Sequence, residues 1–122
     1  EYATGEPISE MIQTTSLEDK ESTKLKKFSL SQNYPNPFNP TTTIEFSLPH
    51  ASPQGQARIT LHVYDTAGRK VKTLIDGSFP AGNHNVQWNG TNDAGQPVGS
   101  GVYFYRLQAG NYTAERKMLL VR

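Results

Sequence analysis

A proline-rich segment, Tyr34-Pro35-Asn36-Pro37-Phe38-Asn39-Pro40, limits what this chain can fold into more than any other stretch. Each proline fixes its own φ and has no N–H to give to a helix or a sheet. Each also disfavours helical backbone at the residue before it. Asparagine can bond its side chain to nearby backbone where proline forbids a regular ladder. We therefore expect residues 34–40 to form a stiff, extended elbow that is pinned by the side chains of Tyr34 and Phe38.

The composition favours one small domain with many turns. The 122 residues include ten glycines and eight prolines, and 34% of the residues are hydrophobic. Frequent turn residues are typical of all-β folds. The formal net charge is only +1, so the charge balance favours neither nucleic acid nor an anionic membrane surface as a partner. The absence of cysteine excludes disulfides and thiol chemistry. The longest apolar run, residues 118–121, is far too short to cross a bilayer.

The first 27 residues differ from the rest of the chain. They contain polar and charged runs with only scattered apolar residues, and the chain opens with Glu1. Such composition is typical of a linker or of the edge of a preceding domain. We therefore expect a fragment or processed product in which residues 1–27 lead from a larger parent protein into a domain over residues 28–122.

From Phe28 onward, apolar residues alternate with polar ones, which is typical of half-buried strands. Turn signals separate the alternating runs, among them residues 65–68, where Gly68 can adopt a positive φ, and residues 79–82 and 89–95. The runs predict seven strands, at residues 28–30, 44–48, 57–64, 71–75, 84–88, 102–107 and 112–121. The connections are too short for most parallel crossovers. The sequence therefore predicts an all-β, immunoglobulin-like antiparallel sandwich of about seven strands.

The expected core combines one face of each long strand. Its candidate members are Ile59, Leu61, Val63, Trp88, Tyr103, Tyr105 and Leu107. We expect the aromatic residues among them to fill the core and to find partners for their polar tips at its edge. The face of the last strand stays open, because either Met118 and Leu120 or Leu119 and Val121 could point inward, and a bulge could reconcile them.

No arrangement of residues indicates a metal, a cofactor or a catalytic centre. The three histidines, His50, His62 and His84, lack the close spacing of ligands. Oxygen-bearing side chains in residues 89–95 loosely resemble a calcium loop, but the glycine is one place late and no glutamate closes the cage. Turn chemistry is the preferred interpretation, and calcium stays an alternative.

Enzymatic chemistry finds no support either. Asp65, Asp76 and Asp93 all lie in expected turns, and nothing in the sequence brings two of them together. The aromatic residues Tyr64, Trp88, Tyr103, Tyr105 and Tyr112 could instead form a platform for stacking on sugars, although a core role is the preferred interpretation.

Several motifs match, in order, the pattern of one known family. They are residues 28–30, 32–40, 43–49, 63–71, 88–92, 95, 100–107, 117–118 and 122. This pattern resembles the C-terminal sorting domain of type IX (Por-type) secretion cargo of Bacteroidetes-like and related bacteria. Its second half is also similar to the immunoglobulin-like domain of flagellar hook-capping proteins. The resemblance implies a structural role, and no role in recognition or catalysis, for one set of motif residues. These are Tyr34, Pro35, Asn36, Pro37, Phe38, Asn39, Pro40, Gly68, Trp88, Gly90, Gly95, Gly101 and Tyr103.

The resemblance implies a domain that addresses a larger exported protein and is not an enzyme. Such a domain is recognised by the outer-membrane secretion and attachment machinery, passes through the periplasm and ends at the cell surface or outside it. The candidate recognition residues are Lys117, Met118, Leu119, Leu120, Val121 and Arg122. We expect the last strand to offer unpaired edge backbone to a partner by strand addition. The alternatives are an accessory carbohydrate-binding module and a structural spacer of an extracellular enzyme.

Overall fold

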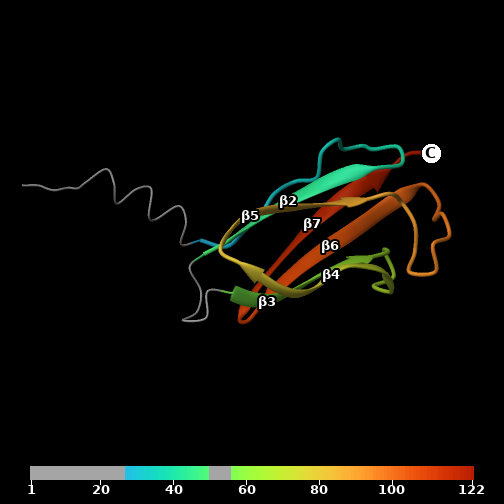
Figure 1. Cartoon of the computed structure of the whole chain (residues 1–122). Coiled ribbons are helices and arrows are strands. Elements are labelled where there is room, and N and C mark those ends of the chain that lie inside the picture. Colours follow the sequence, from blue (N-terminus) through green and yellow to red (C-terminus); the bar gives the residue numbers. More distant parts are fainter. Residues whose placement is uncertain (1–26, 50–55) are drawn as a thin grey trace, which may run out of the picture.

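Two antiparallel sheets face each other across one apolar core in the computed structural model, which describes residues 27–49 and 56–122 (Figure 1). The seven strands are β1 (Ser29–Leu30), β2 (Thr42–Leu48), β3 (Gln56–Tyr64), β4 (Lys70–Pro80), β5 (Gly82–Trp88), β6 (Gly101–Ala109) and β7 (Tyr112–Leu120). The predicted immunoglobulin-like sandwich is thus confirmed. His50 and, apart from Lys27, the expected linker over residues 1–27 lie outside the described residues.

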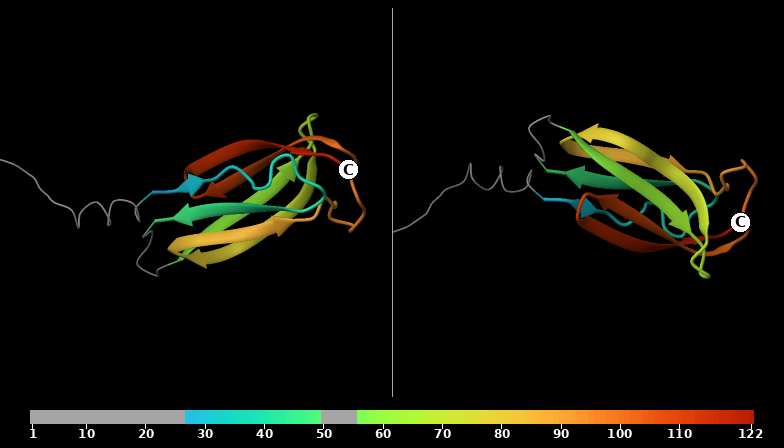
Figure 2. Two further views of the ribbon diagram at one scale, coloured as in Figure 1. Left: turned by 90° about the horizontal axis from the view of Figure 1, so that it is seen from above. Right: turned by 90° about the horizontal axis from the view of Figure 1, so that it is seen from below.

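The strands pair in the order β1-β2-β5 in one sheet and β4-β3-β6-β7 in the other. All neighbouring pairs are antiparallel. Figure 2 shows β4 and β5 next to each other at one side of the sandwich, and β1 and β7 at the opposite side. The edge strands of the two sheets therefore lie side by side, β4 beside β5 and β1 beside β7. Whether an edge is accessible depends on the segments that lie against it.

The period-two alternation of the strands places one apolar face of each sheet inward. The buried apolar residues are Leu30, Phe38, Ile44, Phe46, Leu48, Ile59, Leu61, Val63, Ile75, Trp88, Tyr103, Tyr105, Leu107, Ala109, Met118 and Leu120. All seven predicted core residues are among them. Each large side chain contributes roughly 1.5–3 kcal/mol when it is fully buried, which suffices for a marginally stable small domain.

The buried aromatic rings satisfy their polar atoms at the rim of the core. Trp88 Nε1 donates to the carbonyl oxygen of Thr91 at 2.8 Å. The Tyr105 hydroxyl donates to the carbonyl oxygen of Ser31 at 2.6 Å, and the Tyr103 hydroxyl bonds a carbonyl four residues earlier at 2.8 Å. The rings of Trp88 and Tyr103 meet edge to face, with centroids 5.3 Å apart. The expectation that these residues fill the core and bond at its edge is confirmed.

β4 is longer than the sequence predicts. The expected strand ended at Ile75 and a turn was expected at residues 79–82, but β4 continues to Pro80, and only Ala81 separates it from β5. Its pairing with β3 continues to the last residue and includes two register shifts. Pro80 occupies the terminal position of an edge strand, where a missing N–H weakens the ladder least.

The orientation of β7 is fixed by a regular ladder. Met118 and Leu120 point into the core, while 37% of Leu119 and 46% of Val121 is exposed. The pairing of β6 with β7 is unbroken, so the suggested bulge is wrong. Arg116 shares the inward parity of Met118, and it ends at the rim, where its Nε donates to the carbonyl oxygen of Leu30 at 2.9 Å.

We expect Tyr105 to make stability depend on pH in alkaline solution. Burial raises the pKa of Tyr105 to about 12, whereas an unfolded tyrosine titrates near about 10. The folded state therefore keeps this proton up to a higher pH than the unfolded state does. Between these two pKa values the unfolded state is favoured by losing its proton, so the free energy of unfolding falls as the pH rises.

Unfolding in urea, followed by the fluorescence of the single Trp88, measures this effect. From about pH 10 to pH 12, the free energy of unfolding should fall more steeply for the unchanged protein than for Tyr105→Phe. Near neutral pH, Tyr105→Phe should cost about 0.5–1.5 kcal/mol, because the bond to Ser31 is lost. Equal pH slopes for the two proteins would contradict the expectation.

Candidate functional surface at the end of the last strand

The elbow lies along the outer edge of β7 and pairs with the candidate recognition segment, residues 117–122. The N–H of Phe38 donates to the carbonyl oxygen of Leu119 at 3.0 Å, and the N–H of Val121 donates to the carbonyl oxygen of Phe38 at 2.9 Å. The side-chain oxygen of Asn36 accepts from the N–H of Leu119 at 3.0 Å. The expectation that this end of β7 offers unpaired backbone is therefore wrong, because the elbow already occupies its edge.

One buried ring and one exposed ring stand at the two ends of the elbow. Only 2% of Phe38 is exposed, and its ring lies 5.7 Å from that of Trp88 between centroids. By contrast, 79% of Tyr34 is exposed. Tyr34 is held through its backbone, which exchanges two hydrogen bonds of 2.9 Å with Thr43. The prediction of an aromatic anchor is confirmed for Phe38 and wrong for the side chain of Tyr34.

A buried polar cluster supports the start of the elbow. Asn33 and Thr42 are both buried, and the Asn33 amide donates to the Thr42 hydroxyl at 2.9 Å and to the carbonyl oxygen of Pro35 at 3.1 Å. The Thr42 hydroxyl donates to the same carbonyl at 2.8 Å. Buried polar groups are costly unless they are bonded, so this closed set holds the elbow in one place. All three X–Pro bonds of the elbow are cis.

Sequence reasoning missed Asn33 and Thr42, and it also missed Gln32, whose amide donates to the carbonyl oxygen of Lys117 at 2.7 Å. A polar residue beside a proline-rich segment looks the same whether it is exposed or buried. The available signal was the need of the proline-rich backbone for side-chain partners, and this signal does not say which neighbours supply them.

The side chains of the candidate segment separate into two groups. Met118 and Leu120 belong to the core, whereas Lys117, Leu119 and Val121 point to solvent. Opposite them on β6, Val102 pairs with Leu119 and Phe104 pairs with Lys117, and both side chains are half-buried. These outward side chains form a partly apolar patch that a partner could contact. We call it the β6–β7 patch, and it consists of Val102, Phe104, Lys117, Leu119 and Val121.

Arg122 ties the end of the chain to the loop between β5 and β6. Its Nη2 donates to the carbonyl oxygen of Gly90 at 2.7 Å, and its Nε donates to the carbonyl oxygen of Val98 at 2.6 Å. Its N–H donates to the Ser100 hydroxyl at 2.8 Å. The guanidinium of Arg122 is therefore committed to the fold, so the β6–β7 patch is left with Lys117 as its cation.

Gly90 lies where the elbow, the loop and Arg122 come together. A Cβ added there would lie 2.7 Å from Arg122 Nη2 and 3.2 Å from the carbonyl oxygen of Pro40, and the φ of Gly90 is +74°. Gly95 also has a positive φ, +82°, but a Cβ there would meet open space. Both conformations favour glycine, and only Gly90 also requires the close approach.

The loop over residues 89–95 uses its oxygens in turns. The side-chain oxygen of Asn92 accepts from the N–H groups of Ala94 at 3.0 Å and Gln96 at 2.9 Å. An oxygen of Asp93 accepts from the N–H of Thr73 at 3.0 Å. Across residues 27–49 and 56–122, no three His, Cys, Asp or Glu side chains gather in a way that could hold a metal. These contacts favour turn chemistry over the calcium alternative.

The three acids expected in turns each have a partner of their own, and Asp76 lies within β4 and not in a turn. Asp65 accepts from the N–H groups of Arg69 at 3.0 Å and Ala67 at 2.9 Å, and these bonds, led by the one from Arg69, lower the pKa of Asp65. Asp76 pairs with Arg58 instead. The acids thus serve local structure, since each bonds a backbone N–H or an arginine.

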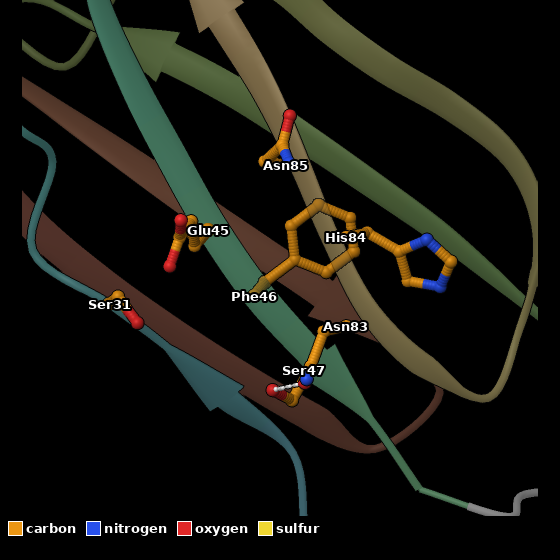
Figure 3. A pocket seen from close by; sticks show the side chains of 7 residues that line it. All are labelled: Ser31, Glu45, Phe46, Ser47, Asn83, His84 and Asn85. Carbon is orange, nitrogen blue, oxygen red and sulfur yellow. Dashed lines mark hydrogen bonds between the residues drawn. The ribbon is translucent and has the colours of Figure 1, made fainter.

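An open hollow of about 250 Å³ lies over β2 and β5 (Figure 3). On the outer face of the sheet, the Ser47 hydroxyl donates to the side-chain oxygen of Asn83 at 2.7 Å. Glu45 and its cross-strand partner Asn85 lie next to this pair. His84 also lines the hollow, but strand alternation puts it on the opposite face from Glu45. The hollow therefore lacks a facing acid and base.

The aromatic residues do not form a platform. Trp88, Tyr103 and Tyr105 are buried in the core. Tyr64 lies under the guanidinium of Arg106, 4.8 Å from its ring centroid. The fifth residue, Tyr112, stacks on Phe28 with centroids 4.5 Å apart. These positions overturn the suggested stacking platform for sugars.

Comparisons with known proteins find one matching sequence family and several solved structures with a similar fold. The sequence profile of the FlgD Ig-like domain family matches residues 34–114. Dimeric latent PorU from Porphyromonas gingivalis is similar at 20% identity with a TM-score of 0.61, over 78% of this chain and 9% of that chain. PorZ, an essential bacterial surface component of the type-IX secretion system of the same organism, is similar at 22% identity with a TM-score of 0.50, over 78% of this chain and 11% of that chain. Among curated proteins, no sequence matches the chain.

The two similar structures share the fold of this chain, which spans about a tenth of the length of each. Within the described part of the chain, no helix has the length and apolar character needed to cross a membrane.

We expect Gly90→Ala to destabilise the protein more than Gly95→Ala. Both changes place a side chain at a positive φ, which costs on the order of 1 kcal/mol, and only the first also displaces Arg122 or Pro40. Urea denaturation of both variants isolates the cost of the close approach. Arg122→Ala should reduce the cost of Gly90→Ala, since it removes the nearest atom. Equal destabilisation by the two glycine changes would contradict this account.

Proposed function

The chain belongs to the FlgD Ig-like domain family, and from this we propose that it is a non-catalytic C-terminal sorting and cell-surface attachment domain of a larger secreted bacterial protein. The observation that carries the proposal is the state of residues 117–122. Their backbone is fixed by the elbow and by Arg122, while Lys117, Leu119 and Val121 remain exposed. A rigid, partly apolar patch without reacting groups suits recognition by another protein.

The proposed mode of recognition uses side chains. Because Phe38 bonds this end of β7, a partner strand could add there only after displacing the elbow. A surface whose backbone is already fixed loses little conformational entropy on binding. The outer-membrane secretion and attachment machinery would therefore contact the β6–β7 patch directly, with Leu119 and Val121 as apolar anchors and Lys117 as the charged one.

The position of the patch suits an address at the far end of a protein. Figure 1 shows the described chain entering the sandwich at one end, next to β1, and finishing at the other end. A parent protein attached through residues 1–27 would lie away from the β6–β7 patch, so the machinery could reach the patch while the parent is folded. In this proposal the protein is exported through the periplasm to the cell surface or the medium. PorU and PorZ, the second a component of the type-IX secretion system, support this assignment through their shared fold.

A structural spacer is the second candidate, and the same geometry favours it. A sandwich whose chain enters at one end and leaves at the other can separate two parts of a protein without being recognised. A carbohydrate-binding role has less support, because the aromatic residues proposed for it are buried or stacked on neighbours.

Changing the exposed part of the patch tests the sorting role while leaving the core intact. The variant carries Lys117→Glu, Leu119→Ser and Val121→Ser in the whole chain fused to a periplasmic reporter, in a host with type IX secretion. We expect the exported fraction to fall at least about tenfold, as when central contacts of an interface are removed, with the reporter retained in the periplasm. Cell fractionation measures the reporter, and circular dichroism of the purified chain confirms folding.

A matched control carries Thr66→Ser, Ala67→Ser and Lys70→Glu, which alter exposed residues around the turn between β3 and β4 and change the charge equally. It should be exported normally. Normal export of the patch variant would reject the patch, and export of the reporter without the domain would favour the spacer.

A further inference from the structure

The four edge strands of the sandwich differ in how they are protected. β1 has only two residues, and the elbow covers one end of β7. β4 carries lysines at positions 70 and 72 and pairs irregularly with β3. β5 (Gly82–Trp88) has seven residues, no acidic, lysine, arginine or proline residue and an unbroken register with β2. Long, regular and uncharged edges are the ones that invite pairing with another chain.

The backbone of β5 presents hydrogen-bonding groups along this edge. On β2, Thr43 and Glu45 bond toward the elbow and β1, so the alternate residues Ile44 and Phe46 bond toward β5. Their partners on β5 are Val86 and His84. The remaining residues of β5 therefore point their N–H and C=O groups away from β2, and these residues are Asn83, Asn85 and Gln87. Within residues 27–49 and 56–122, no bond outside the strand ladders satisfies these groups.

The side chains along the edge are self-complementary. Asn83, Asn85 and Gln87 share the outer, exposed face of β5, and Figure 3 shows the first two next to each other along the strand. A side-chain amide both donates and accepts, so an amide can pair with an identical amide. An antiparallel copy of β5 centred on Asn85 would place Asn85 opposite Asn85, and Asn83 opposite Gln87.

We propose that this protein forms a two-fold symmetric dimer in which the β5 strands of two copies pair antiparallel about Asn85. The Asn85–Asn85 pair and the two Asn83–Gln87 pairs would each exchange two backbone bonds, and a two-fold interface uses the same surface on both copies. The two three-stranded sheets would join into one continuous sheet. On the inner side, the second strand would also cover the half-buried side chains of Val86, His84 and Phe79 at the open side of the sandwich.

Charge does not oppose this arrangement. Glu45 is the acidic residue nearest the edge on this face, directly across from Asn85. In the joined sheet, the two copies of Glu45 would be separated by three strand spacings, about 14 Å. This exceeds the screening length of about 8 Å at physiological ionic strength. A second copy of this neutral edge is therefore an acceptable partner, whereas pairing β4 edges would bring lysines together.

Sedimentation of the whole chain over a concentration series tests the proposal through charge at the two-fold axis. Asn85→Lys places two ammonium groups opposite each other, and Asn85→Asp places two carboxylates there. Like charges on facing residues destabilise a strand pair, so each variant alone should dimerise about fivefold more weakly than the unchanged protein. An equimolar mixture of the two variants should regain dimer, because lysine then faces aspartate.

Thr66→Lys, in the exposed turn between β3 and β4, is the matched control and should dimerise normally. Asn85 is exposed on the outer face, but Asn85→Asp also places a carboxylate across from Glu45 of the same chain. Circular dichroism of all variants therefore checks that the fold is unchanged before dimerisation is compared. A monomer at every concentration overturns the proposal. So does a dimer that Asn85→Lys leaves unchanged, or a mixture of the charged variants that stays monomeric. None of these outcomes bears on the sorting role, which rests on the β6–β7 patch.

Discussion

Two backbone hydrogen bonds at Phe38 connect the beginning of the domain to its end. One comes from the N–H of Phe38 to Leu119, and the other goes from Val121 to the carbonyl oxygen of Phe38. Each contributes only about 0.5–1.5 kcal/mol net, and the buried ring of Phe38, packed beside Trp88, holds the same residue in the core. The segment between two strands of the smaller sheet thereby becomes an edge of the larger sheet. The sheets are joined by backbone pairing as well as by the core between them.

This connection explains why polar residues are buried around the elbow. A backbone rich in proline offers carbonyl oxygens but few N–H groups, so its conformation must be held by side chains. Asn33 and Thr42 satisfy the carbonyl of Pro35, and Asn36 satisfies an N–H of β7. The elbow therefore protects the edge of the last strand while side chains of its neighbours hold the carbonyl of Pro35.

Most of the sandwich could be predicted from the sequence because its strands are half-buried and separated by clear turns. The alternation in β3 identified Ile59, Leu61 and Val63 as core residues, and all three are buried. The extent of β4 could not be predicted, since the turn residues Pro80 and Gly82 occur where the chain passes directly from one sheet to the other. At the end of β7, the four consecutive apolar residues 118–121 obscured which side chains point inward, and the pairing with β6 decides it.

The assignment of residues 117–122 to recognition stays a prediction, whereas the expected unpaired edge backbone of this segment is wrong. The sequence suggests an exposed terminal strand, and nothing in it reveals that Phe38, more than eighty residues earlier, pairs with Leu119 and Val121. Long-range pairing of this kind leaves no periodic signal. Tyr34 illustrates the same limit, because an aromatic residue beside proline looks like an anchor whether its ring is buried or, as here, exposed.

The attachment of Arg122 to the loop before β6 has a consequence for biosynthesis. Met118 and Leu120 complete the core, and Arg122 joins β7 to Gly90 and Val98. While residues 118–122 of a nascent chain are still inside the ribosome, the core lacks Met118 and Leu120 and the elbow lacks its partner on β7. The complete fold of this domain therefore requires residues through Arg122.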